Sequence, residues 1–286
     1  MIQEGSMLAL SRLSVFDDIE VKRFCAAAIL NLAWDNTLSI RMIEEGVLLA
    51  LLELAKAQHE EIRRNTSMAL CRFSYERTGQ LRLVQEGCVS AIISMLNSPD
   101  NDTKEACVKA LINIASHSGA SVAESVVQTI LKISTRKELA SISFSAEAIC
   151  NLSLLSGPRA KVIEDGILDN LCELSQSVAD TDVKIHLATA LCNFSGITSN
   201  LELLSQVRVL ECIEDLLKFE NDLVREMCSL AIANISSHPA SLKNLVISDV
   251  VVQLVELALK SNPTIRENTA LTLSNMSSDG KPGNLR

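Results

Sequence analysis

The chain has 286 residues, 48% hydrophobic but only 3% aromatic, so aliphatic and small side chains must form its core. Gly (10) and Pro (5) are scarce, which disfavours a β-rich or disordered chain. The net charge of −9 argues against general binding to nucleic acid or anionic membranes, because both require a basic surface. We find no signal peptide and no apolar run of ~18 residues. We therefore expect a cytoplasmic protein, with nuclear or cytoskeleton-associated locations as alternatives, and no membrane insertion.

One six-residue motif recurs seven times along the chain. Successive copies are 38 to 42 residues apart, and their fourth residues are Asn31, Arg72, Asn113, Asn151, Asn193, Asn234 and Asn275. A nearly constant period of this size is typical of stacked structural repeats. We therefore expect a single repeat array over residues 1–277, followed by a polar tail over residues 278–286.

The second repeat illustrates the expected unit. Apolar periodicity predicts a short helix over 37–46, a helix over 47–58 and a longer third helix over 62–74. Gly46 suits the left-handed turn that closes the first helix. An acidic residue followed by glycine recurs at Gly5, Gly87 and Gly166. The fourth, sixth and seventh repeats lack this glycine and carry Ser125, Arg208 and Asp249 near that place.

Polar turns precede the third helices. They lie at 17–18, 59–61, 98–102, 179–182, 220–222 and 261–263. Asp, Asn and Ser in these turns are predicted to cap the unpaired N–H groups of the following helix, and Pro263 suits a first helical residue.

The third helix has two faces when it is phased at 100° per residue. In the fifth repeat, the predicted buried face holds Val183, Leu187, Ala190, Leu191 and Phe194. The opposite stripe holds the fourth motif residue and the residues four, seven and eight positions before it. A basic residue lies nine positions before the motif residue in six repeats. We interpret this basic row as structural, pairing with turn acids or covering the core with its stems: Lys22, Arg63, Lys104, Lys184, Arg225 and Arg266.

No catalytic or metal-binding motif is present in the sequence. The nine cysteines form no C-x-x-C pair, so we expect buried, reduced core residues. A phosphate loop, an H-E-x-x-H pair and a nucleophile elbow are all missing. Three histidines fall in turns or at helix ends, whereas His186 lies on the open stripe. We expect a non-catalytic protein without cofactors.

The chain resembles the armadillo repeat in three features. These are the repeat period, the acid–glycine corner after the first helix and the A-[LI]-x-N-[LIF]-[AS] motif in the third helix. The resemblance covers essentially all of residues 1–277. HEAT repeats are the nearest alternative, but they usually have two helices and lack this combination of Gly and Asn. The resemblance implies an all-α, right-handed α-solenoid of about seven three-helix repeats, with the third helices lining a concave groove.

In armadillo proteins, the asparagine at this place commonly hydrogen-bonds the backbone of an extended peptide. A carboxamide both donates and accepts hydrogen bonds, so one per repeat forms a ladder that holds a strand. The resemblance thus implies a scaffold or adaptor with a protein or peptide partner. A second interpretation stays open, in which each asparagine bonds only within or between neighbouring helices.

Residues near the asparagine row indicate which kind of partner to expect. Import-receptor armadillo proteins carry Trp four residues before the asparagine, but Trp34, the only Trp here, lies three residues after Asn31. Binding of nuclear-localisation signals is therefore not expected. Basic residues of the first repeats predict an acidic partner segment: Arg23, Arg64, Arg72 and Lys109, with Asn65 on the same stripe. The later stripe predicts contact with an apolar partner residue: Phe144, His186 and Met227.

An architectural role is the alternative function. A cytoskeletal or axonemal component would use its convex face, the basic row and the ends of the array. Both ends carry core-type apolar residues without a neighbouring repeat, namely Met7, Leu8 and Leu10 at one end and Leu271, Leu273 and Met276 at the other. Because terminal repeats normally need polar caps, we expect a segment of a longer array or end-to-end self-association.

Overall fold

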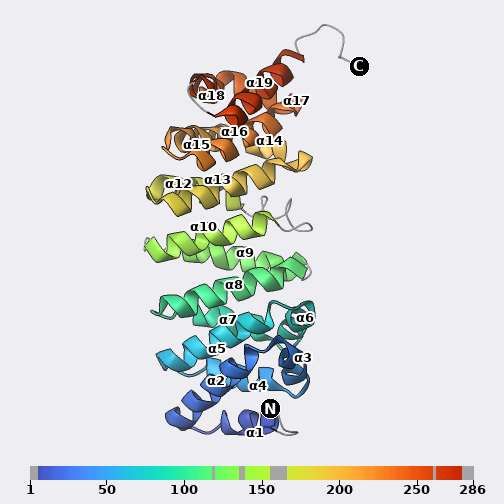
Figure 1. Cartoon of the computed structure of the whole chain (residues 1–286), viewed down its shortest axis with the longest axis vertical. Coiled ribbons are helices and arrows are strands. Elements are labelled where there is room, and N and C mark those ends of the chain that lie inside the picture. The colour runs from blue at the N-terminus through green and yellow to red at the C-terminus, as the bar shows by residue number, and fades with distance from the viewer. Residues whose placement is uncertain (1–5, 118–119, 135–138, 155–165, 260–261, 279–286) are drawn as a thin grey trace. The chain divides into compact units, whose positions relative to one another are not determined.

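The computed structural model describes residues 6–117, 120–134, 139–154, 166–259 and 262–278. These residues are helical nearly throughout and contain no β-strand, which confirms the all-α fold class (Figure 1). The chain forms two compact units, residues 1–129 and 130–286. No helix within the described ranges is long and apolar enough to cross a membrane.

Unit 1 contains the first three repeats. Its helices are α1 (Ser6–Leu13), α2 (Ile19–Ala33), α3 (Asn36–Glu44), α4 (Val47–Ala55), α5 (Glu60–Phe73), α6 (Arg77–Gln85), α7 (Cys88–Met95) and α8 (Asn101–His117). The third helices α2, α5 and α8 pack one on the next, and the second helices α1, α4 and α7 do the same. The next helix, α9 (Ala120–Ser134), crosses the boundary between the units.

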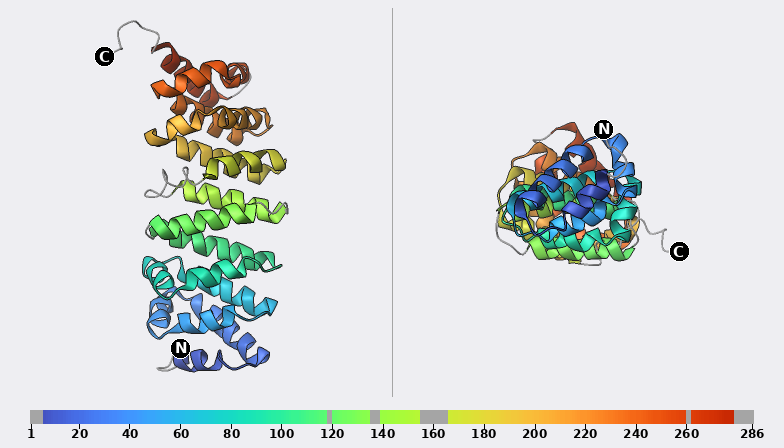
Figure 2. Two further views of the ribbon diagram at one scale, coloured as in Figure 1. Left: turned by 180° about the vertical axis from the view of Figure 1, so that it is seen from behind. Right: turned by 90° about the horizontal axis from the view of Figure 1, so that it is seen from below.

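Unit 2 repeats this arrangement. It contains α10 (Leu139–Ser153), α12 (Leu168–Ser177), α13 (Thr181–Ser195), the 3₁₀ helix η2 (Thr198–Asn200), α14 (Leu201–Leu204), α15 (Val207–Lys218), α16 (Asp222–Ser236), α17 (Pro239–Ile247), α18 (Val250–Ala258) and α19 (Pro263–Ser278). Third helices α10, α13, α16 and α19 pack in order, as do second helices α12, α15 and α18 (Figure 2).

The corners between first and second helices follow the glycine pattern. Gly46, Gly87 and Gly166 have φ angles of 87°, 77° and 91°, in the left-handed region that favours glycine. The fourth repeat lacks this glycine, and α9 continues as a single 15-residue helix where a three-helix repeat would have a corner. In the sixth and seventh repeats an extended residue makes the corner instead, Gln206 (ψ 143°) and Ser248 (ψ 154°). Gly5 lies outside the described residues.

The predicted caps and core are confirmed. Five third helices begin with a side chain that accepts a backbone N–H three residues ahead, at 2.9 to 3.1 Å: Asp18, Asp100, Asp180, Asn221 and Asn262. Pro263 is the first residue of α19. In α13, all five residues predicted to face the core are fully buried.

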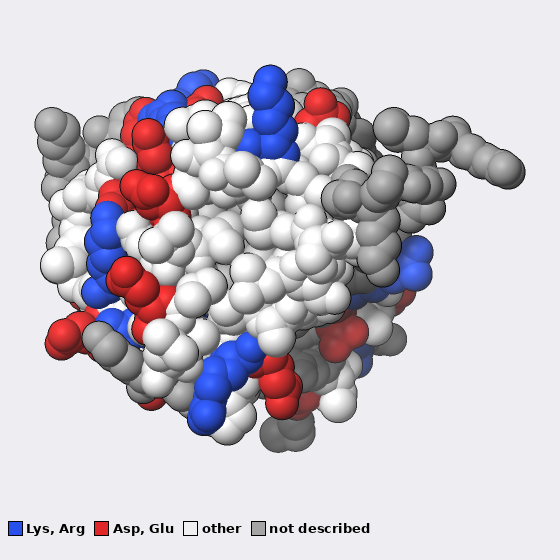
Figure 3. All heavy atoms as spheres, turned by 90° about the horizontal axis from the view of Figure 1, so that it is seen from above, with Lys and Arg blue, Asp and Glu red and all other residues white. Residues whose placement is uncertain are grey.

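The first and last repeats differ in how well their apolar residues are covered. Met7 was expected to lack a neighbour but is fully buried, because α1 packs against both α2 and α4. Leu8, Leu271 and Leu273 are each about half exposed, at 52%, 49% and 45%. Seen from above, the end of unit 2 has an uncharged centre with charged side chains toward its margins (Figure 3). Residues 279–286 of the predicted tail lie outside the described part.

Candidate partner-binding surface

Four asparagines of the predicted row make the same hydrogen bond. Each side-chain amide donates to the serine hydroxyl that ends the motif of the preceding repeat, at 2.9 to 3.0 Å. The pairs are Asn113–Ser74, Asn193–Ser153, Asn234–Ser195 and Asn275–Ser236. A hydrogen bond between neighbouring third helices, one of the two interpretations of the row, is therefore confirmed for these four positions.

The accepting serines are themselves fixed by their own helices. Ser153, Ser195 and Ser236 are buried, and each donates its hydroxyl to the carbonyl three residues earlier, at 2.5 to 2.7 Å. The asparagines are half-buried. For Asn193 and Asn234, this bond uses one amide N–H, and the carbonyl oxygen makes no hydrogen bond to any described residue. The fold therefore orients the amide and leaves one donor and one acceptor for another partner.

The remaining three motif residues, Asn31, Arg72 and Asn151, do not make this hydrogen bond to a serine of the described residues. For Arg72 and Asn151 the reason is visible in the sequence. The motif before Arg72 ends in Ala33, and the motif before Asn151 ends in Ala115, so neither is preceded by a serine hydroxyl. Asn151 is half-buried, and its side chain makes no hydrogen bond to the described residues. Asn31 is exposed.

A second row lies seven positions before the motif residue. Asn65, Phe144, His186 and Met227 are half-buried on α5, α10, α13 and α16, as the helical phase predicted. In unit 2, Phe144, His186 and Met227 occupy equivalent positions on three helices that pack in order. They form an apolar row, with one imidazole, beside the asparagine row.

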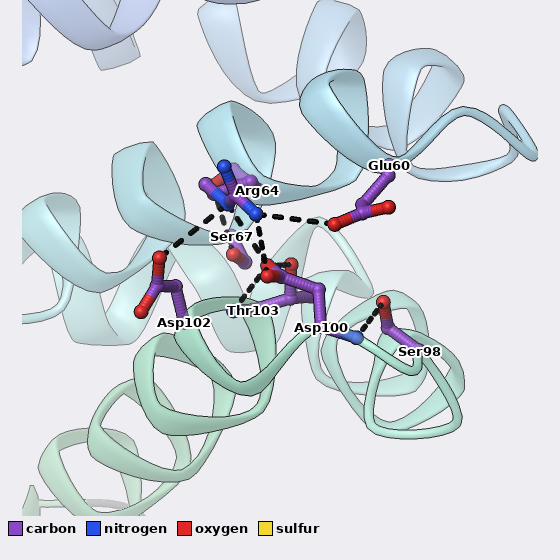
Figure 4. A network of polar contacts seen from close by, with 7 residues as sticks. All are labelled: Glu60, Arg64, Ser67, Ser98, Asp100, Asp102 and Thr103. Atoms are coloured by element: carbon purple, nitrogen blue, oxygen red, sulfur yellow. Dashed lines mark hydrogen bonds and ion pairs between the residues drawn. The ribbon is translucent and has the colours of Figure 1, made fainter.

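Arg64, predicted to attract an acidic partner, is already paired within unit 1. Its guanidinium makes two hydrogen bonds to Asp100, at 2.6 and 3.0 Å, and lies 3.2 Å from Glu60 and 3.5 Å from Asp102 (Figure 4). Asp100 also caps α8 through the N–H and hydroxyl of Thr103. The Arg64 guanidinium, followed by the bonds from Thr103, lowers the pKa of Asp100 to about 2. This network joins α5 to the turn before α8.

Two further basic residues of this set also have carboxylate partners. Arg23 lies 2.9 Å from Glu20 and 3.7 Å from Glu61, and Lys109 pairs with Glu105 one helical turn earlier. The positive charge that the sequence suggested for the first repeats is therefore largely balanced by neighbouring acids.

Arg72 is bound in a different way. Its guanidinium carbon lies 3.4 Å from the centre of the Trp34 ring and 5.7 Å from that of Tyr75. Both rings are more than half exposed. Sequence reasoning missed this aromatic pair, although a signal was present. The only Trp and the only Tyr of the chain each lie three residues after the fourth motif residue.

Three members of the basic row bind backbone carbonyls of their own unit, which supports the predicted structural role for these three, but with partners other than turn acids. Arg63 donates to the carbonyl of Ala57 at 2.9 Å, Arg225 donates to that of Leu217 at 3.3 Å, and Lys184 donates to that of Ser175. Leu217 and Ser175 lie in the last turn of the second helices α15 and α12, and Ala57 lies two residues after the end of α4, where backbone acceptors are unpaired and positive charge is favourable. Turn acids are not the partners of these three, and their bonds favour a structural role over an architectural contact surface.

The cysteines are mostly core residues. Eight of the nine are buried, and Cys192 is partly exposed. Burial raises the pKa of Cys88 to about 12 and that of Cys150 to about 11, so both thiols are protonated at neutral pH. Over the described ranges, no three His, Cys, Asp or Glu residues are grouped so that they could hold a metal ion.

Comparisons with known proteins identify the repeat and the fold. Residues 80–116 match the family model of the Armadillo/beta-catenin-like repeat. An engineered protein solved by a structural genomics consortium has a TM-score of 0.74 at 22% identity, over 96% of this chain and 68% of that chain. A computationally designed armadillo repeat protein for modular peptide recognition has a TM-score of 0.53 at 18% identity, over 94% and 99%. A designed armadillo repeat protein in complex with the peptide (KR)4 has a TM-score of 0.52 at 18% identity, over 95% and 99%. Among curated proteins, no sequence matches the chain.

Proposed function

We propose that this chain, in which residues 80–116 match the armadillo repeat, is a non-catalytic scaffold that binds an extended segment of a partner protein along its third helices. The observation that carries the proposal is the asparagine row of unit 2. Asn151, Asn193, Asn234 and Asn275 occupy the same position on α10, α13, α16 and α19, which pack in order. Three of these amides are held by a serine, so they are ordered before any partner arrives.

The chemistry of the row suits a peptide backbone. The carbonyl oxygens of Asn193 and Asn234 can each accept a peptide N–H, and the second N–H of each amide can donate to a peptide C=O. The amide of Asn275 also donates to the carbonyl of Ala233 at 3.3 Å, so this residue offers mainly its carbonyl oxygen. Packed helices lie ~8–10 Å apart, and an extended chain rises ~3.3 Å per residue. One asparagine would therefore serve about every third residue of the segment. Such contacts hold a strand without reading its sequence.

Side-chain preference would come from the neighbouring apolar row. Phe144, His186 and Met227 are half-buried beside the asparagines and would contact apolar side chains of the segment. The designed armadillo protein that binds (KR)4 supports peptide binding as a use of this fold. A strongly basic peptide is not the expected ligand here, because no Trp lies four positions before any motif residue.

Selection from a random peptide library on the immobilised full chain tests the proposal. Peptides recovered should bind the free protein in a fluorescence anisotropy titration. Asn151→Ala should weaken them about fivefold, the equivalent of ~1 kcal/mol for one lost hydrogen bond. Asn151 is the cleanest position because its side chain makes no hydrogen bond to the described part of the fold.

Asn244→Ala provides the matched control. Asn244 is half-buried on α17, a first helix, and lies outside the proposed groove. Its replacement should leave affinity unchanged. The groove proposal fails if no peptide is recovered, or if Asn151→Ala and Asn244→Ala bind the recovered peptides as tightly as the unaltered protein.

A further inference from the structure

A small pocket lies on the third-helix face of unit 1. Its volume is about 180 Å³, and residues from the end of α2, from α5 and from α8 line it. Trp34 and Tyr75 form aromatic walls, Met68 adds an apolar surface, and Arg72 lies against the Trp34 ring. Volumes of ~300 Å³ and more are usual for drug-sized ligands, so this pocket has room for one amino-acid side chain.

Arg72 is the one cation of this pocket whose charge is not balanced by a neighbour within the described residues. Lys109 is paired with Glu105, and the carboxylate of Asp102 lies 3.5 Å from the Arg64 guanidinium. By contrast, Arg72 makes ring contacts only, and no described carboxylate lies within ion-pairing distance of it. Stacking on a ring does not use the N–H groups at the edge of the guanidinium.

We propose that this pocket binds the carboxylate side chain of an aspartate or glutamate in the partner segment. The inference rests on the proposed function and adds a side-chain preference in unit 1 to the backbone contacts of unit 2. A planar guanidinium held over an indole ring, 3.4 Å from its centre, presents a fork of N–H donors that matches a carboxylate in two hydrogen bonds. The rings fix the orientation of the fork, so less side-chain entropy is lost on binding.

Trp34 supplies a built-in reporter, because it is the only tryptophan of the chain. Its indole N–H gives a single NMR signal from a residue that lines the pocket. Titration with N-acetyl-glutamate methylamide should shift this signal with saturation in the millimolar range, as expected for one charged contact. N-acetyl-glutamine methylamide has the same shape without the charge and should produce no saturable shift.

Two variants separate the role of Arg72 from a general charge effect. Arg72→Lys keeps the charge but loses the planar fork, so the glutamate probe should bind at least tenfold more weakly. Arg41→Lys is the matched control on α3, where Arg41 pairs with Glu45 at 2.7 Å, and it should titrate like the unaltered protein. Amide spectra of both variants verify that the fold is retained.

Three results would overturn the assignment: equal shifts with the glutamine probe, unchanged binding in Arg72→Lys, or tighter binding of N-acetyl-phosphoserine methylamide, which would assign the pocket to phosphate. Failure here is distinguishable from failure of the groove proposal. If the selected peptides depend on Asn151 but the glutamate probe gives no response, the groove proposal stands and the carboxylate pocket is disproved. If the glutamate probe binds but no peptide does, the carboxylate pocket stands and the groove proposal fails.

Discussion

The side-chain amide of Asn193 donates a hydrogen bond of 2.9 Å to the hydroxyl of Ser153, forty residues earlier. Ser153 is fully buried, and its hydroxyl donates a hydrogen bond of 2.5 Å to the carbonyl of Cys150. The same relay recurs between α13 and α16 and between α16 and α19. The row proposed to bind a partner therefore also joins successive repeats, and the two interpretations of the asparagine are compatible.

Replacement of Asn193 by alanine should lower the free energy of unfolding by ~1 kcal/mol, because a buried serine oxygen loses its donor. Ser153→Ala should cost a similar amount, and the double variant should cost less than the sum, with a coupling energy of ~1 kcal/mol. Urea unfolding followed by circular dichroism measures all four corners of the cycle. Asn151→Ala is the control and should change stability by less than ~0.5 kcal/mol. Equal costs for Asn193→Ala and Asn151→Ala would contradict the relay.

The buried residues of the third helices could be predicted from the sequence because the repeats share one pattern. Phasing of the third helix predicted the burial of Val183, Leu187 and Phe194, because a helical period and a repeat period together identify the face that every copy must cover. The half-buried stripe follows from the same phase. The serine partner does not, because periodicity says which residues share a face but not which one of the next repeat lies within hydrogen-bond distance.

The ion pairs of unit 1 were also hard to predict, because periodicity does not show which residues of neighbouring repeats come into contact. Arg64 and Asp100 are 36 residues apart, and the turn acid was expected only to cap its own helix. It does so, and also pairs with an arginine of the repeat before it. A charge on the open stripe is therefore not evidence of a free charge. Arg72 was predicted to contact the partner, but its aromatic support from Trp34 and Tyr75 depended on side-chain directions that spacing alone did not provide.

Asp100 should give the stability of the protein a distinct dependence on pH. Its pKa falls from 3.8 to about 2 on folding, so the ionised carboxylate favours the folded state. The stabilisation is complete above pH ~4 and is lost as the pH falls toward ~2. Because Arg64 is partly exposed to solvent, screening reduces the contribution to ~1 kcal/mol. Asp100→Asn should therefore be less stable than the unaltered protein at pH 7 and nearly equal to it at pH 2, in urea titrations at both values. If Asp100→Asn lowers the free energy of unfolding by the same amount at pH 7 and at pH 2, the ion pair is contradicted.

Lys184 should matter for stability and not for partner binding. Its ammonium donates to the carbonyl of Ser175 near the end of α12, and burial lowers its pKa. Lys184→Met keeps most of the apolar stem and removes the donor, so it should reduce the free energy of unfolding by ~1 kcal/mol. Lys184→Ala also removes the stem and should cost more. The affinity for a groove peptide should not change in either variant. A Lys184→Met protein of unaltered stability but weakened partner binding would restore the architectural interpretation of the basic row.

Two glycines of unit 1 should respond very differently to alanine. A Cβ at Gly46 meets no atom within 4 Å, so Gly46→Ala has only the cost of a left-handed backbone, ~1–2 kcal/mol. A Cβ at Gly79, in α6, would lie 1.9 Å from the carbonyl oxygen of Phe73, which is backbone and not a flexible side chain. Gly79→Ala therefore forces α6 away from the end of α5 and should cost ~3 kcal/mol or more.

Gly196→Ala is the matched control for this pair. Gly196 has a φ of −70°, and a Cβ there would lie 3.4 Å from the carbonyl oxygen of Asn193. Alanine fits this backbone and reduces the entropy of the unfolded chain, so the variant should be as stable as the unaltered protein or up to ~1 kcal/mol more stable. Urea midpoints with an unchanged m-value rank the three variants. A Gly79→Ala protein no less stable than Gly46→Ala would show that α6 does not approach α5 this closely. The close approach matters for the candidate site, because Phe73 lies next to Arg72 in the chain, and a displaced α5 terminus would move the guanidinium relative to Trp34.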